Sequence, residues 1–187
     1  MHVRKIAPLA VLALTVTATS ALLASGGSSE HGRLMPAAVN AKWKSECGAC
    51  HVAYPPALLP ARSWERVMTG LSNHFGEDAS LDAATAREIT GYLVRESGDR
   101  GAGRTGRKAA GAVAPGESPL RITETRWFRH QHDEIAPGVF QRAAIGSPAN
   151  CGACHQGAAD GEFSEDRVAI PRDSGGSRPA QTARGDR

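Results

Sequence analysis

The spacing of apolar residues in the first half of the chain predicts two helices. The first carries its apolar residues at i, i+3, i+4 and i+7, and they share one face: Trp64, Val67, Met68 and Leu71. Ser63 precedes this run and is a favourable N-cap. A second helix is expected over 82–95, with Ser80 or Asp82 as its cap and Gly98 as its end. Its apolar face consists of Ile89, Tyr92 and Leu93.

The second half of the chain has a weaker helical pattern. One helix is expected over 124–135, where Phe128, His132 and Ile135 share a face at i, i+4 and i+7. A short extended segment is expected over 168–170. The pattern therefore predicts a mainly α-helical fold.

Segments without apolar periodicity divide the chain. The stretch 98–119 is rich in Gly, Ala, Arg and Pro, lacks large apolar residues, and is predicted to be a flexible linker. A weakly ordered lead-in is expected over 27–36, and a disordered tail over 173–187. This leaves a first module over 37–97 and a second over 120–172.

The N-terminus has the pattern of a signal peptide, predicted to cover 1–26. Arg4 and Lys5 precede an apolar run, and the small residues Ala24 to Gly27 follow it. An uncleaved membrane anchor is the alternative, but threonines and a serine interrupt the apolar run. The mature protein is therefore expected in the periplasm.

Composition and charge narrow the class of protein. The chain has 187 residues, of which 41% are hydrophobic and 22% charged, as in globular proteins. The formal net charge of +3 falls to +1 without Arg4 and Lys5, and no basic stripe suggests a nucleic-acid partner. Modules of about 50 to 60 residues have marginal apolar cores, so each needs a staple such as a bound cofactor.

All four cysteines lie in two identical pentapeptides of the form Cys-Gly-Ala-Cys-His. The first contains Cys47, Cys50 and His51, and the second contains Cys151, Cys154 and His155. CxxCH is the attachment signature of c-type haem. On a helical turn, positions i, i+3 and i+4 share one face. Both thiols can therefore reach the two vinyl groups of a porphyrin while the histidine lies under the iron.

Four alternatives explain the two motifs less well than haem attachment does: chance, a thiol redox pair, a zinc site and disulfides. A chance origin does not account for two copies that use every cysteine. Thioredoxin-like pairs occur in one βαβ context and need no following histidine. The roughly 100 residues between the motifs disfavour a shared zinc site, and disulfides would not account for His51 and His155. The sequence therefore predicts two covalently bound haem c groups, each part of the core of its module.

The second axial ligand of the first iron is expected to be His74. It lies between the two predicted helices, where a loop can bring an imidazole over the iron. Met68 is the rival, because it is the only methionine inside a module. Its position on the apolar face of a helix favours a role in core packing instead.

For the second haem the choice lies between His132 and His130. The second module contains no methionine, so its haem cannot have His/Met ligation from within that module. His132 shares the apolar face of the predicted helix, whereas His130 falls with Arg126 and Glu134 on a polar face. His132 is therefore the expected ligand. The alternative is an open iron with no histidine bound on this side.

With these residues in place, the chain resembles the dihaem cytochrome c family of periplasmic proteins found beside bacterial membrane cytochromes. The resemblance covers 46–51, 74–77 leading into Leu81, 126–135, 147–150 and 169–171. It implies bis-histidine haems, with His51 paired to His74 and His155 paired to His132. It also implies two redox partners, a small oxygen-binding monohaem cytochrome and a membrane b-type cytochrome. Contact with the membrane would occur only through such partners.

These features predict an electron shuttle rather than an enzyme. The first module resembles a small class I cytochrome c, with a haem motif near its start, a middle helix and a closing helix. The second module, with its motif near the end, has no familiar fold. Two imidazoles on each iron leave no open site for a substrate. The rival classes are a peroxidase-like dihaem oxidoreductase and a gas-binding sensor, and both require one open iron.

Overall fold

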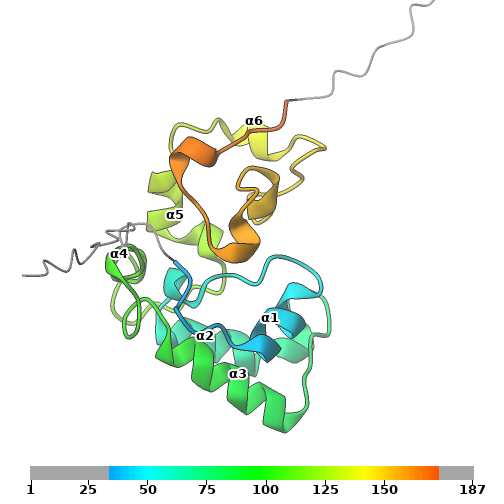
Figure 1. Cartoon of the computed structure of the whole chain (residues 1–187), viewed down its shortest axis with the longest axis vertical. Helices are drawn as coiled ribbons and strands as arrows, with labels where there is room; N and C mark the ends of the chain where they lie inside the picture. Colours follow the sequence, from blue (N-terminus) through cyan, green and yellow to red (C-terminus); the bar gives the residue numbers. More distant parts are fainter. Residues whose placement is uncertain (1–33, 173–187) are drawn as a thin grey trace, which may run out of the picture.

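The computed structural model describes residues 34–172, which form two lobes built from short helices (Figure 1). The lower lobe contains α1 to α3, and the upper lobe contains α5, α6 and a series of 3-10 turns. Between residues 34 and 172 there is no β-strand, only two isolated bridges. The prediction of a mainly α-fold is confirmed. The helices are α1 (Ala41–Gly48), α2 (Ala61–Thr69), α3 (Ala83–Arg95), α4 (Arg104–Gly111), α5 (Arg126–Gln131) and α6 (Pro137–Phe140).

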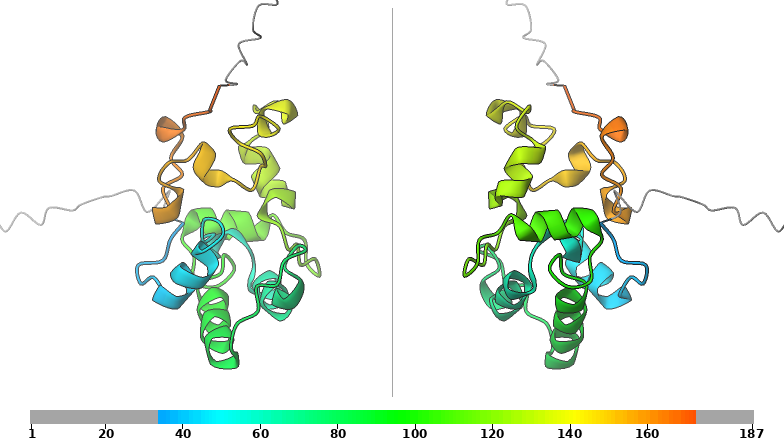
Figure 2. Two further views of the ribbon diagram at one scale, coloured as in Figure 1. Left: turned by 90° about the vertical axis from the view of Figure 1, so that its right-hand side faces the viewer. Right: turned by 90° about the vertical axis from the view of Figure 1, so that its left-hand side faces the viewer.

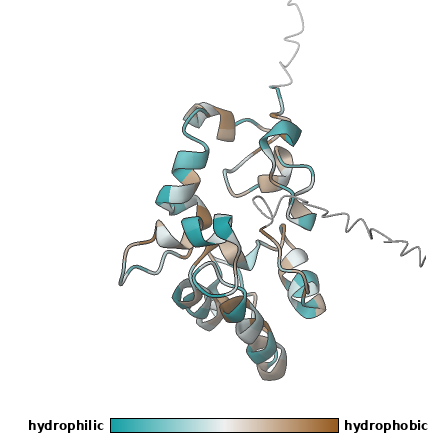
Figure 3. Cartoon of the chain, turned by 60° about the vertical axis from the view of Figure 1, so that its left-hand side comes forward, coloured by the Kyte–Doolittle hydropathy of each residue, from teal (hydrophilic) through white to brown (hydrophobic). Residues whose placement is uncertain are grey.

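The six 3-10 turns connect and extend these helices. They are η1 (Pro56–Leu58), η2 (Leu71–Asn73), η3 (Ile122–Glu124), η4 (Cys151–Ala153), η5 (Ala158–Asp160) and η6 (Glu165–Arg167). Polar and apolar residues share the same helices, as expected for amphipathic helices with one buried face (Figure 3). No helix among residues 34–172 is long and apolar enough to cross a membrane. The predicted signal peptide and the predicted tail lie outside the described residues.

Helix α3 forms where its local sequence predicts it. The Asp82 carboxylate accepts hydrogen bonds from the amides of Ala84 and Thr85, which satisfies two free donors at the helix start. The hydrogen bonds from Thr85 lower the pKa of Asp82, so this cap stays ionised at neutral pH. The predicted apolar face is buried, as shown by Ile89 and Leu93.

Helix α2 begins two residues earlier than the expected cap at Ser63. Pro60 is its N-cap, and the first amide of the helix, that of Ala61, donates to the carboxylate of Asp99 over 2.8 Å. Ser97 donates a second hydrogen bond to the same carboxylate. Burial raises the pKa of Asp99, but these hydrogen bonds outweigh it and the pKa is lowered. The helix start is therefore fixed by a residue 38 positions away, and Ser63 is buried inside the helix.

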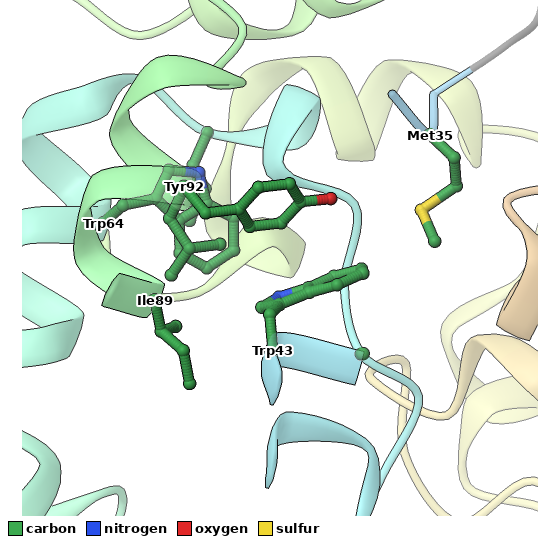
Figure 4. Packing of buried hydrophobic residues seen from close by; sticks show 8 residues of the cluster. Met35, Trp43, Trp64, Ile89 and Tyr92 are labelled. Atoms are coloured by element: carbon green, nitrogen blue, oxygen red, sulfur yellow. The ribbon is translucent and has the colours of Figure 1, made fainter. Parts of the chain in front are cut away.

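The core of the lower lobe lies between α1, α2 and α3 (Figure 4). Trp43 from α1 and Tyr92 from α3 meet with ring centroids 5.3 Å apart, and Trp64 from α2 completes the aromatic group. Met35 also joins this core and is only 8% exposed. The expected weakly ordered lead-in is therefore wrong at this position. Met35 also lies close to Gly161 in the upper lobe, where an added Cβ would collide with the Met35 Cγ.

The stretch 98–119, expected to be a flexible linker, contains helix α4 and packs against both lobes. Helix α4 contacts η1 of the lower lobe and α5 of the upper lobe (Figure 2). A Cβ added at Gly106 would lie 2.8 Å from the Cβ of Ala57, so only glycine permits this close approach. Ala109 and Ala110 are buried on the same helix. The small residues that suggested flexibility are therefore those that allow tight packing.

The last part of this stretch is also tied to the lower lobe. The Arg62 guanidinium on α2 donates hydrogen bonds to the backbone carbonyls of Ala114 and Glu117, and Arg66 donates to that of Ser118.

A second apolar cluster joins the two lobes, with Leu34 and Leu58 from one side and Trp127 and Phe163 from the other. The modules are therefore packed on each other.

Helix α5 is shorter than the predicted helix over 124–135. Thr125 is its N-cap and accepts a hydrogen bond from the Phe128 amide, so the helix starts at Arg126. At its end, the His132 ring nitrogen Nδ1 donates to the Phe128 carbonyl. This side chain takes the acceptor that a continuing helix would use for the backbone amide. The expected extended segment is present as a bridge between Val168 and His155.

Candidate haem-binding sites

The first haem motif follows directly from the end of α1. Cys47 lies in the last turn of this helix and packs against the core, whereas Cys50 is exposed beyond the helix end. Burial raises the pKa of the Cys47 thiol to about 11. Neither cysteine is in a disulfide. Both thiols are therefore free to form thioether bonds, one from the core and one from the surface.

His51 and His74 face each other at this site. Their ring centroids are 6.3 Å apart, and the rings are inclined by 22°. A metal–imidazole nitrogen bond is about 2 Å long and each ring centre lies roughly 1 Å behind that nitrogen, so two imidazoles on one metal have centroids about 6 Å apart. The observed separation thus fits one iron between the two rings.

A tight turn positions His74. The amide of His74 donates to the Glu77 carbonyl over 2.7 Å, and the Glu77 amide donates back over 3.2 Å. The two central residues, Phe75 (φ 57°) and Gly76 (φ 105°), both have positive φ. This is the pattern of a type I′ turn, which suits Gly76 but is uncommon for a bulky residue such as Phe75.

The second haem motif begins in the 3-10 turn η4 rather than in an α-helix. The amide of His155 donates to the Cys151 carbonyl over 2.8 Å, which brings the first cysteine and the histidine together. The Ala169 amide donates to the Cys154 carbonyl, so the segment that follows η6 supports the motif. Burial raises the pKa of Cys151 to about 11. Both cysteines are free, as in the first motif.

His132 faces His155 in the upper lobe. Their ring centroids are 6.2 Å apart and the rings are almost perpendicular, at 85°. The His132 ring stacks on Phe128 at 4.1 Å, and its Nδ1 lies 2.9 Å from the Phe128 carbonyl oxygen. Since a carbonyl only accepts, Nδ1 carries the proton and Nε2 is left with the lone pair that binds a metal. His51 is arranged in the same way, with its Nδ1 2.8 Å from the Val52 carbonyl.

His130 and Met68 are placed away from these pairs. The His130 side chain is 76% exposed and lies 3.3 Å from the carboxylate of Asp133. Met68 packs against the lower core and lines a cavity of about 200 Å³ together with Leu71 and Leu81. The structure therefore brings His74, not Met68, opposite His51, and His132, not His130, opposite His155.

A tyrosine that the sequence pattern did not single out lies between the two motifs. The Tyr54 ring stacks on His51 with centroids 4.7 Å apart, and its hydroxyl donates to the Ala149 carbonyl over 2.7 Å. Burial raises the pKa of Tyr54 to about 12, so the hydroxyl stays protonated. A cavity of about 390 Å³ separates the motifs and is lined by Cys50, His51, Val52, Tyr54, Ala149, Asn150 and Cys151. The two sites thus open onto shared space.

Comparison with known proteins decides the family. Residues 43–163 match the family described as "Dihaem cytochrome c". The chain belongs to the dihaem cytochrome c family. It therefore carries two covalently bound haem c groups, and the four free thiols and two histidine pairs described above fit them. When bound, each haem iron supplies one-electron redox chemistry.

Solved structures of dihaem cytochromes c are similar to this chain. A diheme cytochrome c from Rhodobacter sphaeroides is 48% identical, with a TM-score of 0.60, and the match covers 67% of this chain and 97% of that one. A diheme cytochrome type c from Shewanella baltica is 38% identical, with a TM-score of 0.59, and the match covers 71% and 93% of the two chains. A search of curated proteins found no match.

Proposed function

We propose that this dihaem cytochrome c is an electron shuttle in which two histidines hold each iron. The observation that carries the proposal is the repeated geometry of the two histidine pairs, His51 with His74 and His132 with His155. Their ring centroids lie 6.3 and 6.2 Å apart, although the pairs are built from unrelated local structures. With both axial positions filled by the chain itself, neither iron offers a place for a substrate.

The residues around each pair keep the imidazoles in place. Hydrogen bonds from Nδ1 of His51 and His132 to backbone carbonyls fix the orientation of both rings and leave Nε2 as the atom that can bind iron. Stacking of Phe128 on His132 limits rotation of that ring. Imidazole is a stronger donor than a thioether and favours the ferric state, so both potentials lie below those of His/Met cytochromes.

The arrangement also supports electron exchange between the two haems of one chain. Tyr54 contacts the proximal histidine of the first site and is hydrogen-bonded to Ala149, two residues before the second motif. The shared cavity has Cys50 on one side and Cys151 on the other. We infer that an electron entering at one haem reaches the other without leaving the protein, and that the packed lobes hold this separation constant.

Location and partners complete the proposal. Covalent haem attachment and the N-terminal pattern of residues 1–26 support export to the periplasm. By resemblance, the redox partners are a small oxygen-binding monohaem cytochrome and a membrane b-type cytochrome. A peroxidase-like enzyme or a gas sensor would need one iron without a second axial histidine, and the paired rings at both sites favour the shuttle.

The near-infrared spectrum of the oxidised protein tests the ligand of the first iron. We expect no charge-transfer band of a methionine–iron bond, because His74 and not Met68 faces His51. Both haems should titrate at negative potentials in the same sample. A methionine band that disappears in Met68→Leu would show that Met68 holds the first iron and that the proposed ligation is wrong.

A further inference from the structure

A residue of the second module contacts the loop that carries His74. The Arg121 guanidinium carbon lies 3.8 Å from the ring centre of Phe75, over its face. This distance is well within the range of about 6 Å for a cation–π contact. Phe75 is otherwise one of the exposed large apolar residues of the described chain, with 46% of its surface exposed.

Phe75 needs an external contact to stay where it is. Its φ of 57° is unfavourable for an aromatic residue, and turns of this type usually contain Asn or Gly at that position. Its ring contacts His74 at a centroid distance of 4.7 Å, so any movement of Phe75 also affects the imidazole. The Phe75 ring therefore contacts both the His74 imidazole and the Arg121 guanidinium.

Arg121 is itself held in place. The next residue, Ile122, packs against the core of the lower lobe and against the apolar cluster that joins the lobes, and the Glu124 carboxylate lies 3.6 Å from the Arg121 guanidinium. The Glu124 amide also donates to the Arg121 carbonyl. Arg121 thus projects from a well-packed turn onto the loop of the first site.

We propose that Arg121 is a positioning residue that latches the His74 loop, so that the second module holds the distal ligand on the first iron. The proposal rests on the proposed ligation of that iron by His74. Loss of the latch lets the 74–77 turn open more often, and His74 then leaves the iron more often. The dihaem protein would in this way keep its first haem closed to small ligands only while the two lobes stay docked.

The latch predicts faster opening in Arg121→Gln. In the protein carrying both haems, hydrogen exchange of the His74 and Glu77 amides should be about two- to fivefold faster than in the wild type, the range expected for an exposed cation–π contact. Carbon monoxide should enter the reduced first haem faster by a similar factor. Both rates in Arg121→Lys should lie between those of the wild type and those of Arg121→Gln. Arg126→Gln, which removes the same charge from an exposed position in α5, should leave both rates unchanged.

Variants of Phe75 separate the effect of the cation–π contact with Arg121 from the effect of the strained backbone in the 74–77 turn. Phe75→Leu keeps the strained positive φ but lacks the aromatic ring, so it should behave like Arg121→Gln, whereas Phe75→Tyr should behave like the wild type. Wild-type amide exchange in both Arg121→Gln and Phe75→Leu would overturn the latch. His74→Ala serves as the reference in the carbon monoxide assay. If His74→Ala leaves the first haem closed, the proposed ligation fails, whatever the exchange rates show.

Discussion

His132→Ala is expected to open the second iron to external ligands. The His132 imidazole faces His155 at 6.2 Å and is held by stacking and by a hydrogen bond to Phe128. The nearby His130 points to the surface, and the second module contains no methionine, so neither can replace it. Water should enter, and this haem should become partly high-spin. Half of the total haem, the second haem of each chain, should then bind carbon monoxide when reduced. The potential of this haem should rise, because a ligand that stabilises the ferric state is lost.

His130→Ala is the matched control for this prediction. His130 is two residues away and is largely exposed, and it pairs with Asp133 at the surface. Its removal should leave both haems low-spin and closed to carbon monoxide. A carbon monoxide adduct in His130→Ala together with a closed second haem in His132→Ala would reverse the assignment of the two histidines.

Gly106→Leu is expected to destabilise the folded protein strongly. A side chain at this position would collide with Ala57 in η1 and would push α4 away from the lower lobe. We expect the free energy of unfolding to fall by about 3 kcal/mol, the upper end of the usual range for overpacked positions. Urea unfolding of the protein carrying both haems, followed by far-ultraviolet circular dichroism, would measure the loss.

Gly111→Leu provides the control on the same helix. Apart from its chain neighbours and the backbone of α4 itself, a Cβ at Gly111 would meet nothing within 4 Å, so the change should be neutral or should stabilise α4 by up to about 1 kcal/mol through higher helix propensity. Equal stability of the two variants would mean that 98–119 is a flexible linker after all. A large difference would show that the stretch is a packed part of the fold.

The elements that the sequence predicted well are those specified by neighbouring residues. The cap at Asp82 and the apolar face of α3 lie within one segment, so they can be read directly from the pattern. Helix α4 differs because the need for its small residues comes from Ala57, which is far away in sequence. The early start of α2 likewise depends on Asp99. Local patterns contain no information on such partners.

The residues of the candidate site also divide into those that the local sequence specifies and those that depend on a contact with the other lobe. The CxxCH motifs, the few other histidines and methionines, the loop position of His74 and the helical face of His132 predicted His74 and His132 as second ligands. The structure places these rings opposite His51 and His155, and the ligation itself stays a prediction. Tyr54, Arg121 and Met35 were missed, because each acts through a contact with the other lobe. The predicted flexible linker over 98–119 gave no reason to expect contacts between the lobes, so residues of this kind could not be identified from the sequence. An aromatic residue three positions after His51 is a usable signal only once the lobes are known to be docked.

The electron paramagnetic resonance spectrum of the fully oxidised protein with both haems tests the central claim most directly. Two low-spin ferric signals of equal intensity are expected, because the proposed ligation gives each iron two imidazole ligands. The nearly parallel rings of His51 and His74 (22°) should give a rhombic signal, and the nearly perpendicular rings of His132 and His155 (85°) a signal with one large principal g value. A high-spin signal from either iron in the unmodified protein would contradict the account, and an enzyme or a gas sensor with an open haem would take its place.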